Sequence, residues 1–379
     1  MELKLCLTGN EPRQRYLFDA LAAVARVEAV VPFDQIDPVT KYAAAALSFA
    51  WPRTEWWENF HMHPLLQRRR RNVLARGVQP LSSQLDALLM WGSLFQPFVP
   101  SDPFAVPFYT YIDESFSQTN MPEKWQARFS RRKKSHELQA RTYDAAEAVL
   151  CMSDWARGQT LDSYRSLPSS KVIAVGWGPC GVDLSREDLS NVERDPIVLH
   201  VSNDFYRKGL DYLIDTATKV RRAIPTARFV VIGKDNGGAA PPCTAEVEFL
   251  GRISDKQSLA EHFRHACLFF LPHRFDRSPH VLVEAMSAAL PLVASAQGGA
   301  LELIRGHGTG YLCEVGATDQ YAEAIVTLLR DAGLRHSIGA RSLARMKEYY
   351  AWPAIATRIV NIMSSNNRVL ERVRARGSD

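Results

Sequence analysis

The chain has 379 residues, of which 46% are hydrophobic and 23% charged, and its formal net charge is +5. These values are typical of a soluble globular protein of about two or three domains. They exclude a disordered chain, a collagen-like repeat and a small disulfide-stapled scaffold. The charge is too small for a dedicated nucleic-acid-binding protein, so we expect no nucleic-acid partner.

The cysteines and the apolar runs bear on the cellular compartment. The cysteines contain no CxxC pair, and Cys6, Cys151, Cys267 and Cys313 lie in apolar runs that predict buried free thiols. Free thiols fit a reducing cytoplasm. The N-terminal residues lack the apolar region of a signal peptide, and no stretch approaches the roughly 20 apolar residues of a membrane span. We therefore expect a cytoplasmic protein, and peripheral attachment to the inner face of a membrane stays open.

Short apolar runs recur along the chain, and segments with helical periodicity separate them. Each run is rich in Val, Leu, Ile or Phe and shows little polar alternation, which is typical of strands buried on both faces of a parallel sheet. The predicted strands of the first half are 4–9, 27–33, 87–92, 107–113, 148–153 and 171–176. Those of the second half are 197–202, 229–233, 247–251, 267–272, 291–295 and 310–314.

The alternation of strands and helices predicts βαβ units and open, doubly wound sheets. Twelve strands are many for one such sheet, so we expect two sheets of about six strands each. A polar stretch at 181–196 marks the seam between them. We therefore predict Rossmann-like domains at 1–183 and 184–351, followed by a closing helix and polar tail at 352–379 that packs back on the first domain.

The segment 271–286 follows a buried strand and carries the strongest site pattern. Ser278 is a suitable N-cap and Pro279 a suitable first residue for a helix over 279–289. The amino end of such a helix suits a phosphate group. Glu284 lies about a turn and a half inside, where its carboxylate can accept hydrogen bonds from sugar hydroxyls. The alternative is a capped core helix with an incidental glutamate.

Two further segments follow strands of the same half. The pair Gly298-Gly299, before Ala300-Leu301, would let the backbone approach a ligand closely, or it forms an ordinary tight turn. The pair Arg207-Lys208 could bind a diphosphate, or it is a solvated pair of cations. Because all three segments follow strands of one predicted sheet, they can converge on one edge and form a single site.

At these residues the chain resembles the family-4 glycosyltransferases of the GT-B fold. The family has an acidic residue, seven others and a glutamate before Ala-Met, as in Asp276 to Glu284 with Ala285-Met286. The resemblance is specific over 170–355 and only architectural over 1–150. Its other elements are similar to Arg207-Lys208-Gly209, Gly298-Gly299-Ala300-Leu301-Glu302, Gly181-Val182-Asp183 and Trp352.

The resemblance implies two Rossmann-like domains that face each other across a cleft. It implies a retaining, metal-independent hexosyltransferase of class EC 2.4 with no cofactor. The donor would be a nucleotide-diphosphate sugar bound by the second domain, and the acceptor a glycan, a glycolipid or another molecule bound by the first.

The resemblance also assigns roles to residues of the second half. Lys208, helped by Arg207, would hold the donor diphosphate, and Glu284 would bind the nucleotide ribose. Asp276 would lie near the donor sugar, and the backbone of 298–301 would contact the sugar or the phosphates.

The chain departs from the family pattern at two positions. Asp276 stands where glutamate is commoner, and Asp113 stands where many relatives carry a histidine after a strand. Asp113 could contact a hydroxyl of the donor sugar, or it could cap the next segment. The turn at Gly9-Asn10 follows the first strand and is either a place where the acceptor approaches or an ordinary βα turn.

Two basic runs lie in the first half, at 68–71 and 124–141. They are solvated helix faces, a surface for an anionic membrane or a phosphate-bearing lipid acceptor, or a nucleic-acid contact. Trp51, Trp56, Trp57 and Phe60 lie close to the first run and form either an interfacial aromatic patch or core. His61 and His63 lie in the same aromatic stretch, and we expect no metal site there.

Two rival functions stay open. A nucleotide-sugar epimerase shares the architecture, but the spacing of Asp276 and Glu284 favours a transferase. A catalytically weak partner subunit that scaffolds a glycan-assembly complex would fit Asp276 and the missing histidine. A Rossmann oxidoreductase is disfavoured, because no GxGxxG follows any predicted strand.

Overall fold

The computed structural model describes residues 2–9, 14–33, 36–49, 56, 59–92, 97–98, 105–113, 133–189, 192, 194–234 and 244–376. The chain folds into two compact units, one formed by Met1–Gly176 with Ile355–Asp379 and the other by Trp177–Ala354. The predicted domains 1–183, 184–351 and 352–379 differ from these units at both boundaries. Residues 177–183 belong to the second unit because they pack on the helix that carries Glu284.

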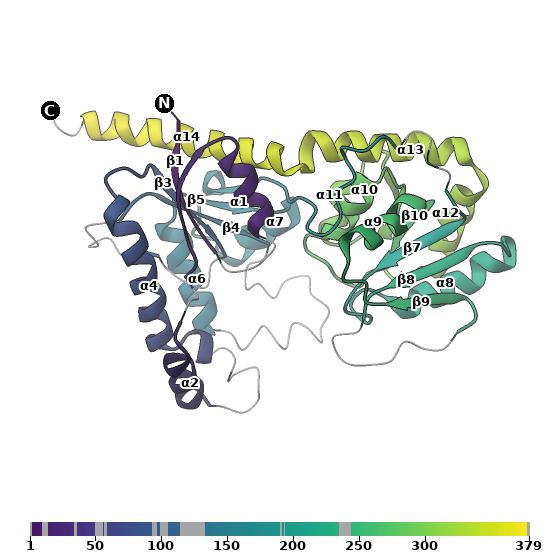
Figure 1. Ribbon diagram of the computed structural model, residues 1–379, viewed down its shortest axis with the longest axis horizontal. Coiled ribbons are helices and arrows are strands. Elements are labelled where there is room, and N and C mark those ends of the chain that lie inside the picture. Colours follow the sequence, from purple (N-terminus) through teal and green to yellow (C-terminus); the bar gives the residue numbers. More distant parts are fainter. Residues whose placement is uncertain are drawn as a thin grey trace. The chain divides into compact units, whose positions relative to one another are not determined.

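The first unit contains a parallel six-stranded sheet in the order β2-β1-β3-β4-β5-β6 (Figure 1). Its central strands β3 and β4 are apolar throughout and almost completely buried, which is why they show no polar alternation in the sequence. The strands are β1 (Lys4–Thr8), β2 (Arg26–Val31), β3 (Ala87–Trp91), β4 (Phe108–Ile112), β5 (Ala148–Cys151) and β6 (Val172–Ala174).

Helices lie between the consecutive strands of this sheet, except that no helix is described between β3 and β4. The described helices are α1 (Gln14–Ala22), α2 (Pro38–Leu47), α4 (Pro64–Val78), α6 (Lys133–Ala145) and α7 (Asp154–Ser163), with short helices η1 (Gln79–Leu81) and η2 (Ser169–Lys171). The long helix α14 (Trp352–Arg376) enters this unit from residue 355. Its side chains Ile355, Ile359 and Met363 are buried at helical spacing.

The second unit contains another parallel six-stranded sheet, in the order β12-β11-β10-β7-β8-β9. Its strands are β7 (Ile197–Val201), β8 (Arg228–Ile232), β9 (Val247–Gly251), β10 (Leu268–Leu271), β11 (Leu292–Ser295) and β12 (Gly310–Cys313). Its helices are α8 (Leu210–Ala223), α9 (Lys256–His265), α10 (His280–Ser287), α11 (Ala300–Ile304), α12 (Thr318–Arg330) and α13 (Ala332–Arg345), with a π-helical turn η3 (Met346–Tyr350).

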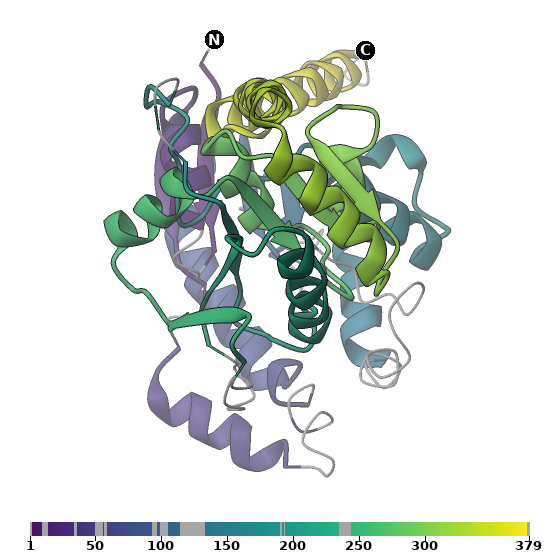
Figure 2. The same cartoon turned by 90° about the vertical axis from the view of Figure 1, so that its right-hand side faces the viewer.

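Helices cover both faces of the second sheet (Figure 2). Phe269 and Phe270 are neighbours in β10, so their side chains point to opposite faces. Phe269 stacks on Phe263 of α9 with ring centroids 5.7 Å apart. Phe270 meets Tyr321 of α12 edge to face at 5.1 Å. Burial on both faces explains why this strand reads as a continuous apolar run.

The predicted fold class is confirmed, because each of the twelve apolar runs forms a strand of one of two doubly wound parallel sheets. Cys6, Cys151, Cys267 and Cys313 are buried free cysteines, as expected. Cys243 lies outside the described residues. Within the described part of the chain, no helix combines the length and the apolar character that a membrane crossing requires.

Candidate active site

Three loops with predicted site residues leave the second sheet at the carboxyl ends of adjacent strands. Residues 202–209 follow β7, 272–279 follow β10 and 296–299 follow β11. The chain order reverses between β7 and β10, and ligands bind at such a switch point in open α/β sheets. The structure therefore brings together the three segments that the sequence placed on one edge.

Asp276 is the centre of this edge. Its carboxylate Oδ2 forms an ion pair with Lys208 Nζ and lies 3.7 Å from Arg207 Nη1. The side chains of Lys208 and Asp276 are only 8% and 13% exposed, so this ion pair is almost completely buried. Arg207 also pairs with Asp204 at 3.0 Å and donates to the carbonyl of Phe275 at 3.2 Å. The predicted diphosphate-binding cations are thus held against Asp276.

The charge state of Asp276 follows from this environment. Burial acts to raise the pKa of its carboxyl, but the positive charges of Lys208 and Arg207 outweigh burial and hold the pKa well below its usual range. The carboxyl is therefore ionised at any physiological pH. An ionised group can accept hydrogen bonds and stabilise positive charge, but it cannot act as a general acid.

Two buried histidines, His200 and His273, lie close enough to the ion pair to interact with its charges, and the sequence analysis did not identify either of them. The ring nitrogens of His273 lie 3.0 Å from the carbonyl of Leu271 and 3.1 Å from that of Gln297. His200 of β7 lies 2.9 Å from the carbonyl of Phe270, and burial lowers its pKa to about 4. These contacts link β7, β10 and the loop after β11, so both histidines support the site from within.

Glu284 of α10 fixes the segment that enters the second unit. Its Oε1 accepts hydrogen bonds from the backbone N–H groups of Gly181 at 2.7 Å and Cys180 at 3.2 Å. Next to them, Trp352 Nε1 donates to the carbonyl of Pro179 at 2.7 Å. Glu284, which we predict to bind the ribose, therefore holds the backbone of residues 180–181 in place. The spacing of the sequence pattern did not show this structural role.

Ser278 is not the N-cap that the sequence predicted. The helix α10 begins at His280, and Pro279 occupies the N-cap position without a side-chain cap bond. Ser278 is one residue too early to cap the helix. Its hydroxyl is buried and has no hydrogen-bond partner among the described residues. The helix also ends at Ser287, two residues before the predicted end.

The Gly298-Gly299 turn packs closely against the loop that carries Asp276. Gly298 has φ +58°, and a Cβ there would lie 1.8 Å from the carbonyl oxygen of Asp276. The N–H of Gly299 donates to the same oxygen at 3.2 Å. Ala300 and Leu301 form the first turn of α11, and Ala300 is buried. The glycines are thus needed for contact between the two loops of the site.

The predicted residues of the first unit lie at the carboxyl ends of their own strands. Asp113 directly follows β4 and is exposed, and Gly9 directly follows β1. The side chain of Gln14 fills the space beside Gly9, where a Cβ would lie 1.8 Å from its Oε1. Asn10, Trp51, Trp57 and residues 124–132 of the second basic run lie outside the described residues.

The first basic run divides into side chains with different surroundings. Arg69 pairs with Asp37 at 3.5 Å, and Arg70 is buried and donates to the carbonyl of His61 at 3.1 Å. Arg68 and Arg71, one turn apart, line a surface cavity of about 560 Å³. Among the described residues, no group of three or more His, Cys, Asp or Glu side chains could hold a metal ion.

Comparison with known proteins supports the expected family. Residues 182–345 match the family model described as glycosyl transferases group 1, which confirms the resemblance over this region. A curated relative is the GDP-mannose-dependent monoacylated alpha-(1-6)-phosphatidylinositol monomannoside mannosyltransferase of Corynebacterium glutamicum. It is 27% identical over 196 residues, or 48% of this chain and 51% of the relative. The chain thus matches about half the length of this relative.

Solved structures match almost the whole chain. Sucrose-phosphate synthase from Thermosynechococcus elongatus gives a TM-score of 0.65 at 18% identity and covers 96% of this chain and 98% of its own. Anabaena HepE in complex with UDP gives 0.62 at 18% identity, with 96% and 100% covered. These likenesses show the fold, and the chain has the GT-B fold.

We predict that Asp276→Asn lowers the free energy of unfolding of the second unit by about 3 kcal/mol or more at pH 7, because the substitution leaves buried cations without their partner. The pKa of the Asp276 carboxyl is lower in the folded protein than in the unfolded protein, where it is about 3.9. The contribution of this carboxylate to the free energy of unfolding is therefore complete above that unfolded pKa and is lost as the pH falls toward the folded pKa. The difference between wild type and variant should therefore narrow below about pH 4.

Urea unfolding followed at pH 7, 5 and 3.5 measures this difference. Asp211→Asn is the matched control, since Asp211 pairs with Arg274 at 2.6 Å but is 58% exposed. Its loss should stay below about 1 kcal/mol. The predicted role of the buried ion pair is contradicted if Asp276→Asn lowers the free energy of unfolding no more than the control does, or by an amount that does not change with pH.

Proposed function

We propose that the protein is a glycosyltransferase that moves a sugar from a nucleotide-diphosphate sugar to an acceptor, with retention of anomeric configuration and without a bound metal ion. The observation that carries the proposal is the cluster of Asp276, Lys208 and Arg207 beside the start of α10 and the Gly298 turn. The match of residues 182–345 to the glycosyl transferases favours this function over an epimerase or a scaffold subunit.

The donor diphosphate would bind between the cations and α10. A helix amino end offers N–H groups and partial positive charge to a phosphate. The unpartnered hydroxyl of Ser278 lies just before this helix and can donate one more hydrogen bond. Lys208 and Arg207 would stabilise the negative charge that develops on the diphosphate as it leaves. HepE, which shares the fold, was solved with UDP, and this supports a nucleotide donor.

The donor ribose and sugar would use the two carboxylates. A carboxylate has about four lone-pair positions, so Glu284 can hold the 180–181 backbone and accept from ribose hydroxyls at the same time. Asp276 is ionised and would stabilise the positive charge that forms at the anomeric carbon as the bond to the diphosphate breaks. The backbone of 298–301 would contact the sugar or the phosphates.

We assign the acceptor to the first unit, and we propose a glycan or a lipid-linked acceptor at an anionic membrane surface on the cytoplasmic side. The relative from Corynebacterium glutamicum is named for a phosphatidylinositol mannoside acceptor. Asp113 and Gly9, at the ends of β4 and β1, are the residues proposed to face the acceptor or the donor sugar.

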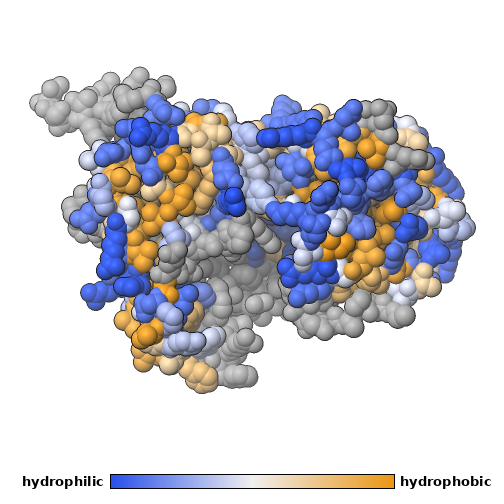
Figure 3. Space-filling model, in the orientation of Figure 1, coloured by the Kyte–Doolittle hydropathy of each residue, from blue (hydrophilic) through white to orange (hydrophobic). Residues whose placement is uncertain are grey.

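The surface of α2 supports attachment to a membrane. Val39, Tyr42, Leu47 and Phe49 are 78%, 76%, 70% and 80% exposed and form an apolar stripe along this helix and just after it. Figure 3 shows apolar atoms on the surface around α2. The helix packs on α4, whose Arg68 and Arg71 line a cavity. An apolar stripe beside arginines suits an anionic bilayer.

We predict that Glu284→Gln and Arg207→Met abolish the stabilisation of the protein by its donor. A panel of UDP-, GDP-, ADP- and dTDP-sugars is tested by thermal shift, and a donor at 100 times its Kd should stabilise the wild type by about 2.7 kcal/mol. The control Lys219→Met removes an exposed ion pair of the same unit and should respond like the wild type. Full stabilisation of both site variants by the donor would contradict the assignment of the site.

Retention is tested separately, by NMR of the anomeric configuration of the product. A product with the inverted anomer would contradict retention.

We predict that the double substitution Arg68→Ser with Arg71→Ser weakens binding to anionic vesicles by roughly thirtyfold, at about 1 kcal/mol for each basic residue. Leu47→Ser with Phe49→Ser should weaken it as well, since both side chains are exposed on the apolar stripe. Sedimentation with vesicles of phosphatidylserine and phosphatidylcholine measures both effects. Arg221→Ser with Arg222→Ser in α8 is the charge-matched control, and equal pelleting of all variants contradicts membrane attachment.

A further inference from the structure

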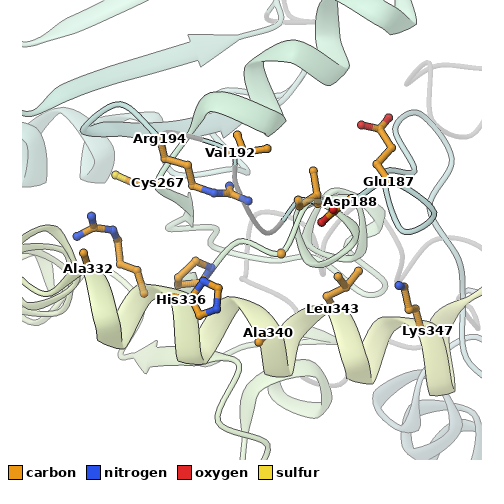
Figure 4. A pocket seen from close by; sticks show the side chains of 14 residues that line it. Glu187, Asp188, Val192, Arg194, Cys267, Ala332, His336, Ala340, Leu343 and Lys347 are labelled. Atoms are coloured by element: carbon orange, nitrogen blue, oxygen red, sulfur yellow. The ribbon is translucent and has the colours of Figure 1, made fainter.

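A second cavity lies within the unit Trp177–Ala354, away from the candidate active site (Figure 4). Its volume is about 510 Å³. Cys267 and Pro291 line it and directly precede β10 and β11, so it opens at the amino ends of these strands. Asp276 and Gly298 follow the carboxyl ends of the same strands. The two sites therefore lie at opposite edges of one parallel sheet.

The cavity is lined by cations whose donors are only partly used. Arg194 donates from Nη1 to the carbonyl of Ala266 at 2.8 Å and from Nη2 to that of Ala288 at 2.7 Å. A guanidinium has five N–H donors, so three of them remain. Figure 4 shows Arg194 and Lys347 on opposite sides of the space above α13. A ligand in this space would meet Arg194 on one side and, on the other, Lys347 together with the carboxylates of Glu187 and Asp188.

Three cations, Arg194, Arg335 and Lys347, and two acids, Glu187 and Asp188, line the cavity, so its basic groups outnumber its acidic groups by one. Among the described residues, Arg194, Arg335 and Lys347 form no ion pair, and Arg335 uses only Nη1, on carbonyls at the end of α12. Glu187 is already paired with Arg264 at 2.5 Å. Burial lowers the pKa of Arg194, and repulsion from Arg335 adds to this effect. An anion near both guanidiniums would relieve the repulsion.

The wall of the cavity also includes a strained residue. Ala289 has φ 54°, and no other non-glycine residue in the described part of the chain has a positive φ. Gly339 of α13 packs on its carbonyl so closely that a Cβ would lie 2.2 Å from the oxygen. Left-handed backbone at a non-glycine residue costs about 1–2 kcal/mol and persists only where its surroundings hold it. The packing of Gly339 therefore holds the wall in place at Ala289.

We propose that this cavity binds a small organic anion, a phosphate ester or a carboxylate, whose charged group contacts Arg194 and is attracted across the space by Lys347, and whose apolar part packs on Leu343 and Pro291. The cavity volume is in the range of small-molecule sites, about 300–1,000 Å³. The anion is separate from the donor, because it binds at the opposite edge of the sheet. This proposal does not depend on the glycosyltransferase assignment.

Titration calorimetry with phenyl phosphate and with phenylacetate tests the proposal on the full chain. At least one of these anions should bind the wild type, and the tighter one identifies the charged group. Lys347→Glu replaces an exposed positive charge of the cavity wall by a negative one and should weaken that binding by about tenfold or more, because a like charge then faces the anion. Arg222→Glu, an exposed reversal in α8, should leave the binding unchanged.

Hydrogen exchange with the bound anion locates the site. Protection should appear in peptides that cover 289–291 and 332–347. Protection confined to 202–209 and 272–281 would place the anion in the donor site and overturn the proposal. The proposal is also overturned if neither anion binds at 10 mM, or if neutral benzyl alcohol binds as tightly as they do.

Discussion

The buried ion pair between Asp276 and Lys208 is the interaction on which the carboxyl edge of the second sheet depends. Lys208 comes from the loop after β7 and Asp276 from the loop after β10. The carbonyl of Asp276 accepts from Gly299, which comes from the loop after β11. One residue therefore joins three loops. Two buried charges are tolerable only as partners, so a change in either of them acts on the whole edge.

This arrangement has a consequence for the proposed reaction. In the proposed reaction, the donor diphosphate would bind Lys208 and Arg207, the two cations that Asp276 already contacts. Because Asp276 is ionised, it would compete with the diphosphate for these cations as the donor binds. With the donor bound, Asp276 would face the positive charge that forms at the anomeric carbon as the bond to the diphosphate breaks. Without a donor, this ion pair would hold the three loops of the site together. With a donor bound, the same charged side chains would stabilise the charges that develop in the reaction.

The fold was predictable from the sequence because its strands are buried on both faces. Continuous apolar runs such as 268–271 are typical of parallel strands, and each of the twelve predicted runs forms one strand. The boundary between the units was harder to place. The polar stretch after residue 183 looked like the seam, but Glu284 binds the backbone of 180–181 across about a hundred residues of sequence. No local sequence pattern predicts a contact between residues so far apart in the chain.

The site was predictable as a set of strand ends, but its internal contacts were not. The sequence placed Asp276, Lys208 and Glu284 at one edge. It did not show that the first two pair with each other. Ser278 looked like an N-cap, yet the helix begins one residue later because Pro279 takes that position. His273 escaped notice, since a single buried histidine after a strand has no periodic pattern.

The central claim is that Asp276 and the donor diphosphate share Lys208. A double-mutant cycle with Asp276→Asn and Lys208→Met tests it, with the affinity of the preferred nucleoside diphosphate measured by calorimetry for all four proteins. We predict that Asp276→Asn alone tightens binding, that Lys208→Met alone weakens it, and that the effect of Asp276→Asn disappears when Lys208 is absent. An effect of Asp276→Asn that is the same with and without Lys208 would contradict the account.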